Sequence, residues 1–188
     1  MTRQRWVDEG LRVLAEEGAP GVRIDRVAAR LGLSKGSFFH HFDGIAGYRR
    51  ALLEHWENTA VRELGDGAPQ PLLEDLAARV GALVDLRMEA AVRAWAFQDA
   101  EAAAAQERVD LARLAALESV WSQIIDDPSR AHTAALLPHL LMIGACVALP
   151  ATSRADLESV FSLLAELIPA VPPTQVADPP PSSGSARG

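Results

Sequence analysis

The 188-residue chain has few of the residues on which several classes of protein depend. Its single cysteine, Cys146, cannot form a disulfide within the chain, and no cysteine–histidine cluster has the spacing of a zinc site. No run of roughly eighteen apolar residues occurs. The closest, 136–150, is interrupted by Pro138 and His139, so we expect a buried helix rather than a membrane span. The N-terminal sequence lacks the apolar segment of a signal peptide. We therefore expect a cytoplasmic protein that uses no metal or cofactor and no membrane.

Lysine is also scarce. Lys35 is the only lysine, and every other basic residue counted in the net charge of −7 is an arginine. That charge is divided unevenly. Residues 1–50 carry nine basic and six acidic residues, a net charge of +3, whereas residues 51–188 carry nine basic and nineteen acidic residues, a net charge of −10. Counterion release on binding DNA depends on local charge, so this distribution indicates an N-terminal part suited to contact phosphates.

Residues 22–42, VRIDRVAARLGLSKGSFFHHF, have the pattern of two short helices joined by a tight turn. Apolar residues recur at the spacing of one buried helix face, at Ile24, Val27, Ala28 and Leu31. Gly32 follows where a helix must stop, because glycine takes a positive φ without steric penalty. Ser34 is a good N-cap for the second helix. The pattern predicts a helix-turn-helix, whose second helix enters the major groove of DNA.

The stretch LSKGSFFHHF at 33–42, preceded by Arg26-Val27-Ala28 and Leu31-Gly32, resembles the DNA-binding signature of TetR-type (TetR/AcrR) transcriptional regulators. The resemblance extends to further apolar and small residues, namely Trp6, Leu11, Leu14, Ala15, Gly18, Tyr48 and Leu52. The rest of the chain matches the family only in length and helical character. The resemblance implies an all-α fold of about nine helices, with an N-terminal three-helix DNA-binding domain and a helical bundle for ligand binding and dimerisation.

The resemblance also assigns DNA contacts to residues in and around the second helix. These are Arg26, Ser34, Lys35, Gly36, Ser37, Phe39, His40, His41 and Arg49. Other roles stay open for three of them, because Lys35 and Arg26 could be solvated surface residues and His41 could pack on the small helical core. Two positions depart from the family, which usually has tyrosine at Phe39 and lysine at Ile45. Both departures remove phosphate contacts, for which Arg49, Arg50 and the N-terminus of the next helix could compensate.

Hydrophobic periodicity predicts helices, and no strands, along the rest of the chain. The expected helices span 3–17, 25–31, 35–41, 45–64, 72–86, 88–97, 100–125, 130–149 and, after the cap Ser153, a last helix to 168. The sequence GDGAPQP at 65–71 is a break, and the Pro/Ser/Gly-rich segment 169–188 is expected to be disordered. We thus predict a DNA-binding domain at 1–50, a ligand-binding and dimerisation domain at 51–168, and a tail at 169–188.

The second half offers candidates for a ligand pocket and for a dimer interface. The pocket candidates, of which the aromatic ones are more often core filler, are Met88, Arg93, Trp95, Phe97, Trp121, His139 and Met142. The helix at 130–149 is apolar on nearly every side, so a second copy is its natural cover. The interface candidates are Leu137, Leu140, Leu141, Gly144, Leu157, Phe161 and Leu164.

These features predict a homodimeric TetR-like transcriptional regulator, with repression the favoured role. Its partners would be a near-palindromic double-stranded DNA operator and an unidentified small-molecule effector that lowers operator affinity. The alternative is a dimeric helical ligand-binding protein of the same fold with weakened or lost DNA binding, which Phe39 and Ile45 support. An enzyme is not expected, because the five histidines lie beside no nucleophile motif and Cys146 lies in an apolar helix.

Overall fold

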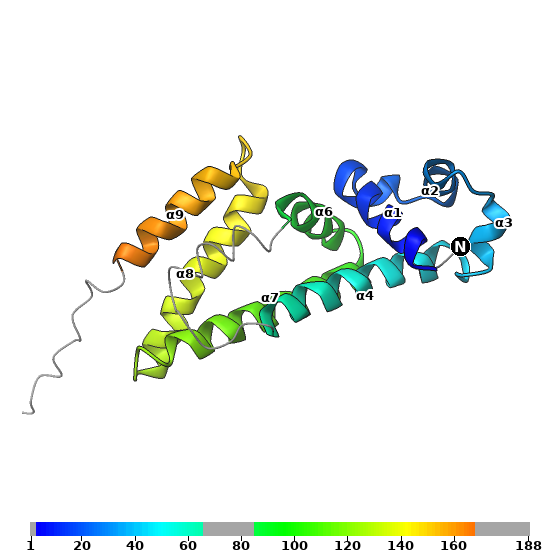
Figure 1. The fold of residues 1–188 in the computed structure, drawn as a ribbon. Helices are drawn as coiled ribbons and strands as arrows, with labels where there is room; N and C mark the ends of the chain where they lie inside the picture. The colour runs from blue at the N-terminus through cyan, green and yellow to red at the C-terminus, as the bar shows by residue number, and fades with distance from the viewer. Residues whose placement is uncertain (1–2, 66–84, 168–188) are drawn as a thin grey trace, which may run out of the picture.

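The computed structural model describes residues 3–65 and 85–167, and within these ranges the chain is all helical, which confirms the predicted fold class (Figure 1). The helices are α1 (Arg3–Glu17), the short 3₁₀ helix η1 (Ala19–Gly21), α2 (Ile24–Leu31), α3 (Lys35–Phe39), α4 (Gly44–Gly65), α6 (Leu86–Ala96), α7 (Ala100–Trp121), α8 (Pro128–Val147) and α9 (Arg154–Leu167). The expected helix at 72–86 lies outside the described residues up to position 84, as do the predicted break after residue 65 and the tail at 169–188. We call residues 3–50 the head and residues 85–167 the body.

Side-chain caps determine where the helices of the body begin. Asp85, Asp99 and Asp127 each accept hydrogen bonds from two backbone N–H groups in the first turns of α6, α7 and α8, at 2.9–3.3 Å. These bonds satisfy amides that have no partner within the helix. Asp85 therefore caps α6 rather than continuing a helix from 72, and Asp127 starts α8 at Pro128, two residues before the expected position. The predicted cap Ser153 accepts a hydrogen bond from the Asp156 amide at 3.1 Å.

Helix α7 ends at Trp121, four residues before the predicted end at 125. The backbone amides of Ile124 and Ile125 both donate to the Trp121 carbonyl, at 3.0 and 2.9 Å, so the chain tightens into turns there. These turns free Asp127 to take the extended conformation of an N-cap. Helix α3 likewise ends at Phe39, two residues before the predicted end at His41.

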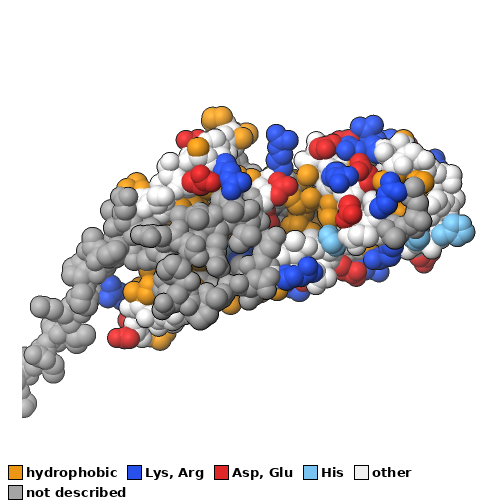
Figure 2. All heavy atoms as spheres, in the orientation of Figure 1, with side chains coloured by type: hydrophobic (Ala, Val, Ile, Leu, Met, Phe, Trp, Pro, Cys, Tyr) orange, Lys and Arg blue, Asp and Glu red, His pale blue; other side chains and the backbone are white. Residues whose placement is uncertain are grey.

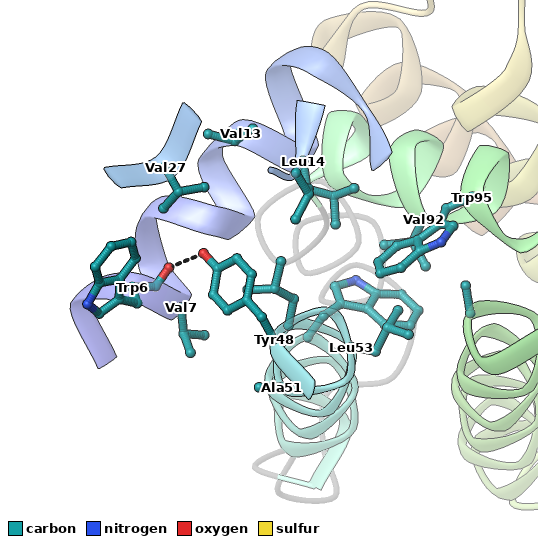
Figure 3. Packing of buried hydrophobic residues seen from close by; sticks show 14 of the residues in the cluster. Trp6, Val7, Val13, Leu14, Val27, Tyr48, Ala51, Leu53, Val92 and Trp95 are labelled. Atoms are coloured by element: carbon teal, nitrogen blue, oxygen red, sulfur yellow. Dashed lines mark hydrogen bonds between the residues drawn. The ribbon is translucent and has the colours of Figure 1, made fainter. Parts of the chain in front are cut away.

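One hydrophobic core runs from the head into the body (Figure 3). It is formed by buried residues of α1, α2, α3, α4, α6 and α7, among them Trp6, Leu14, Val27, Phe38, Tyr48, Leu52, Leu53, Val92, Trp95 and Val109. The Tyr48 hydroxyl donates a 2.5 Å hydrogen bond to the Trp6 carbonyl, which ties α4 to α1. Burial raises the pKa of Tyr48, and the nearby Glu9 raises it further, so the phenol stays a hydrogen-bond donor. Because α6 packs against α1 as well as α7, the head and the body share this core.

Helix α1 can approach α4 closely because residue 10 is glycine. A Cβ at Gly10 would overlap the Tyr48 hydroxyl and would lie 2.9 Å from Cδ2 of Leu52. Both neighbours are fully buried, so neither side chain has free space into which to move. The crossing of α1 and α4 thus depends on the missing side chain.

Two ion pairs set the register of α4 against α7. Arg50 bonds Glu101 at 2.6 Å, and Arg108 bonds both carboxylate oxygens of Glu57 at 2.6 and 2.7 Å. The partners are spaced identically on the two helices and the signs of their charges alternate, so a shift of one heptad would bring like charges together. The pair of Arg50 with Glu101 is exposed, and in the other pair Arg108 is exposed while Glu57 is partly covered, so solvent screens both pairs and each contributes little to stability. Their effect is on alignment more than on stability.

Helix α8 has two apolar faces. One face, which carries Ala131, Ala135, Pro138 and Met142, is buried against the rest of the chain. The other carries Leu137, Leu140 and Val147, which are 48, 58 and 59 % exposed. The expectation of a buried helix is therefore wrong for this chain alone. By length and composition α8 could cross a membrane, with a mean hydropathy of 1.2 over a window that is 28 % buried.

Helix α9 packs against α8 within the same chain. Leu157 and Phe161 are buried there, with Leu141, Ala145 and Leu164 partly buried beside them. These positions follow the i, i+4, i+7 spacing of one helix face. Leu157 and Phe161, which we expected at a dimer interface, are thus used to hold α8 and α9 together, because the inward face of α9 has to be covered within the chain first.

Candidate nucleic-acid interface

The turn between α2 and α3 is held by backbone hydrogen bonds at Gly32. Gly32 has a φ of 67° and a ψ of 33°, in the left-handed region of backbone conformations. The Gly32 amide donates to the Ala29 carbonyl at 3.2 Å, and the Leu33 amide donates to the Ala28 carbonyl at 2.9 Å. Together the two bonds satisfy carbonyls at the end of α2 and reverse the chain, as in a Schellman motif. Ser34 then caps α3, because its side chain accepts a 3.3 Å hydrogen bond from the Ser37 amide.

Helix α3 has an aromatic underside and a polar outer edge. Underneath, Phe38 is fully buried and its ring lies 5.2–5.4 Å from those of Trp6, Phe42 and Tyr48. The predicted contact residues that are exposed in and beside α3 are Ser34, Lys35, Gly36, Phe39 and His40. Ser37 and His41 are half-buried. The histidine side chains in this region reach the outer end of the head, where α3 lies (Figure 2). A rigid aromatic base therefore presents a short polar helix to an external partner.

Three of the predicted contact residues, Lys35, His41 and Phe39, make different contacts within the protein. Lys35 forms no ion pair within the described residues, although its charge helps Arg23 to lower the pKa of Asp25. The His41 ring lies 6.4 Å from the Phe42 ring, edge to face, so it also contributes to the aromatic packing. Phe39, 60 % exposed, offers a large apolar surface and no hydrogen bond.

Arg26 is held by α1 rather than left free for phosphate. Its Nε and Nη2 both donate to the Glu17 carboxylate, at 3.0 and 2.7 Å, and these bonds lower the pKa of Glu17. Arg30 is bound in the same way by Glu9 at 2.5 Å and by Glu16 at 2.6 Å. Acidic and basic side chains accordingly alternate over the head (Figure 2). The network fixes α2, and with it the start of α3, against α1.

The arginines expected to compensate for Phe39 and Ile45 are also engaged within the protein. Arg49 is half-buried and donates to the Ala19 carbonyl at 3.5 Å, while Arg50 pairs with Glu101. Ile45 packs against the core. Sequence reasoning missed these partners because they lie 30 and 51 residues away along the chain.

The seven predicted pocket residues do not line one common space. Met88 and Trp95 belong to the shared core, whereas Trp121 packs with Ala131 and Ala135 in a separate cluster. Phe97 is 89 % exposed at the end of α6, so it lines no cavity of this chain. Aromatic side chains at helix ends are free to project from the fold, and periodicity does not show which of them do. Of the remaining three, Met142 is buried on α8, and Arg93 and His139 are close enough to interact electrostatically.

Arg93 is part of a buried charge cluster between α6 and α7 that the sequence did not reveal. It donates to both carboxylate oxygens of Asp110, at 2.8 and 2.6 Å. Arg113 does the same to Glu89, at 2.8 and 2.6 Å, and the Glu89 side chain is only 3 % exposed. Burial lowers the pKa of the adjacent His139, and the two arginines lower it further against the opposing effect of Asp110. Among residues 3–65 and 85–167, no group of three potential metal ligands is placed to hold an ion.

The sequence of the head is similar to that of known bacterial regulatory proteins. Residues 7–52 match the family described as bacterial regulatory proteins, tetR family. A stretch of 52 residues is 35 % identical to the uncharacterized HTH-type transcriptional regulator TtgW of Pseudomonas putida, and it covers 28 % of this chain and 39 % of that protein. The chain thus spans well under half the length of this curated relative.

Most of the chain shares its fold with solved structures. A transcriptional regulator of Rhodococcus sp. Rha1 superposes with a TM-score of 0.73 at 21 % identity, covering 92 % of this chain and 100 % of that one. The multidrug binding protein EbrR complexed with imidazole superposes with a TM-score of 0.58 at 17 % identity, covering 87 % of this chain and 94 % of that one. The head is therefore matched in sequence by the tetR family of bacterial regulatory proteins, and most of the chain shares its fold with solved transcriptional regulators.

Proposed function

We propose that this protein is a homodimeric repressor of transcription that binds a near-palindromic DNA operator through α3 and is released by a small-molecule effector. The observation that carries the proposal is the construction of α3. Its underside packs on Trp6 and Tyr48, and its outer edge presents Lys35, which forms no ion pair among the described residues. A lysine at the start of a recognition helix can reach a guanine edge or a phosphate.

A second copy of the chain is the occupant we propose for the outer face of α8. Leu137, Leu140 and Val147 share that face with Gly144, around which there is open space for a close neighbour. Val160 and Leu163 of α9 add further exposed apolar surface. None of these residues is charged, and a helix face of this kind is ordinarily covered. Pairing two copies through α8 and α9 would form a four-helix interface and place two recognition helices on one operator.

The effector would bind in the body, near the buried charge cluster. Among the described residues, Arg93 has a buried Nε–H without a partner, and Gln106 has a buried side-chain oxygen without one. Buried polar groups are normally satisfied, so these two atoms are available to a polar ligand. The relative EbrR, which was solved with imidazole, shows that a protein of this fold can hold a small molecule. Helix α6, which carries Arg93, also packs against α1, so a shift at this helix reaches the head.

The second candidate is a helical binding protein of the same fold that has lost DNA recognition. Its support is that Phe39 cannot hydrogen-bond a phosphate and that Ile45 packs into the core. The two candidates differ in one measurable property, because only the regulator binds DNA with a preference for sequence. The dimer is common to both.

Selection from a random-sequence DNA library tests the proposal. The wild-type protein should enrich a two-fold symmetric sequence with half-sites about one helical turn, or a multiple of it, apart. Recovery of no enriched sequence would favour the second candidate.

Analytical ultracentrifugation tests the assembly. Leu140→Glu would place an unpaired carboxylate in the proposed interface, so it should sediment as a folded monomer without operator binding. Leu111→Glu is the matched control, because Leu111 is 60 % exposed on α7 and lies outside that face, so this variant should stay dimeric. Leu157→Glu should instead unfold the contact between α8 and α9. A Leu140→Glu protein that remains dimeric, or a wild type that partitions into lipid vesicles through α8, would refute the proposed interface.

A further inference from the structure

Most arginines of the head are neutralised by carboxylates of the protein itself. Among its described residues Arg12, Arg23, Arg26, Arg30 and Arg50 form ion pairs at 2.5–3.3 Å. Their positive charge is therefore largely cancelled by acids of the same protein, so these five arginines are less available to phosphate than their number suggests.

Arg3 differs from these arginines. It is exposed at the start of α1, and it has no carboxylate partner among the described residues. Its guanidinium carbon lies 5.1 Å from the centroid of the Phe42 ring, in the geometry of a cation–π contact. The stack occupies one face of the planar guanidinium and leaves the N–H groups along its edge free to donate.

The stack places Arg3 beside the recognition helix. Phe42 follows the end of α3 by three residues and is itself fixed, since its ring packs on Phe38 and Tyr48 at 5.2 and 4.8 Å. The N-terminus of the described chain accordingly lies next to α3 (Figure 1). Lys35 stands at the beginning of α3 and Arg3 beyond its end, so two cations without a carboxylate partner in the described part of the chain flank the same short helix.

Helix stability does not explain a cation at this position. The first turn of α1 carries Arg3 and Arg5 and no acidic residue. Positive side chains oppose the dipole at a helix N-terminus, where acidic residues are favoured. The arrangement becomes favourable when an anion approaches this side of the head, and a planar arginine can bind two oxygens of a phosphate at once.

We propose that Arg3, positioned by Phe42, binds a phosphate of the DNA backbone beside the C-terminal end of α3. This contact rests on the proposed function, and it supplies a backbone interaction on the side of α3 where Phe39 and Ile45 offer none. Because it engages phosphate, it strengthens binding to every DNA sequence alike and orients α3 without reading a base.

Arg3→Gln tests the proposal, with fluorescence anisotropy on the duplex selected by the wild-type protein and on a scrambled duplex. Each lost phosphate contact reduces the slope of log K against log salt by about 0.9, so a dimer that loses two should show a slope shallower by about 1.8. Between about 50 and 200 mM salt, the affinity of the wild type should fall about tenfold more than that of the variant. Both duplexes should weaken by the same factor.

Two further variants complete the experiment. Arg3→Lys keeps the charge and loses the planar stack, so it should retain most of the salt slope with a smaller loss of affinity. Arg154→Ala removes the same charge from the exposed start of α9, at the end of the molecule remote from α3, and should change neither quantity (Figure 1). Circular dichroism checks that each variant is folded.

The outcomes separate this proposal from the proposed function. Wild-type affinity and slope in Arg3→Gln would overturn the Arg3 contact and leave DNA binding in place. A loss confined to the selected duplex with an unchanged slope would also overturn it, because Arg3 would then read a base. A wild type that binds neither duplex would overturn the proposed function itself.

Discussion

Replacing Glu89 with leucine removes the central acid of the buried charge cluster. Leucine fills a similar volume, so little cavity is created and the effect is mainly electrostatic. Glu89 accepts two hydrogen bonds from Arg113, at 2.8 and 2.6 Å, and both side chains are about nine-tenths buried. Without Glu89 the Arg113 charge stays in the interior, where its remaining neighbour is Asp110.

Breaking a buried ion pair by removing one partner costs about 3–5 kcal/mol. Asp110 already binds Arg93 and compensates Arg113 only in part, so we expect the lower end of that range. For a chain of this length, about 3 kcal/mol corresponds to a decrease in melting temperature of roughly 6–12 °C. The measurement is urea unfolding followed by circular dichroism at one fixed protein concentration, since a dimer's stability depends on concentration.

A double-mutant cycle separates the charge effect from packing. Arg113→Leu alone should also destabilise, whereas Glu89→Leu with Arg113→Leu should recover most of the lost stability, because no unpaired charge remains. Glu57→Gln is the control, since its partner Arg108 is exposed to solvent, which screens the pair, so the loss of this pair should change stability little. A Glu89→Leu variant that loses no more stability than this control, or a double variant no more stable than either single one, would contradict a buried charge effect.

Three other predictions concern the close helix crossing, the buried histidine and the missing phosphate contacts. Gly10→Ala should destabilise the fold by about 1–3 kcal/mol through overlap with α4, whereas Gly47→Ala, with open space around it, should be neutral or stabilising; equal melting temperatures would contradict the crossing. Since the folded pKa of His139 lies below its ordinary value, the unfolded chain binds more protons just below pH 6.5, so stability should fall as the pH drops there. His139→Gln should remove that part of the decline, and an identical pH profile would show that His139 does not titrate on unfolding. Phe39→Tyr with Ile45→Lys should strengthen DNA binding and steepen its salt dependence by about one to two in a dimer, while an unchanged slope would mean that the backbone is approached differently.

Much of the fold could be predicted from local signals. Helix α1 begins and ends at the predicted residues, and Ser34 and Gly32 mark the turn before α3 as their chemistry requires. Such signals work because caps and left-handed glycines act within a few residues of the chain. The helix starts after Asp85 and Asp127 were not predicted, although they depend on a local signal of the same kind. An aspartate directly before Leu86 or Pro128 is an N-cap signal.

The candidate site was less predictable because its charges pair across long stretches of chain. Arg26 and Arg30 find their acids on α1, up to 21 residues away, and no spacing rule gives that pairing. The stack of Arg3 on Phe42 joins residues that only the tertiary fold brings together. On α8 and α9, periodicity identified the apolar residues correctly but did not show which face is covered within the chain. The sequence therefore could not show that Leu157 is buried and Leu140 exposed.

The central claim is that α3 is the element that recognises DNA, and Lys35→Ala tests it most directly. Binding of the wild type and the variant should be compared on the selected duplex and on duplexes with single base-pair changes, across a series of salt concentrations. We expect Lys35→Ala to lose about 1–3 kcal/mol of binding free energy. If Lys35 reads a base edge, sequence preference should relax at one position; if it binds phosphate, all duplexes should weaken alike and the salt slope should shrink. A folded Lys35→Ala protein with unchanged affinity, unchanged preference and unchanged slope would contradict the claim.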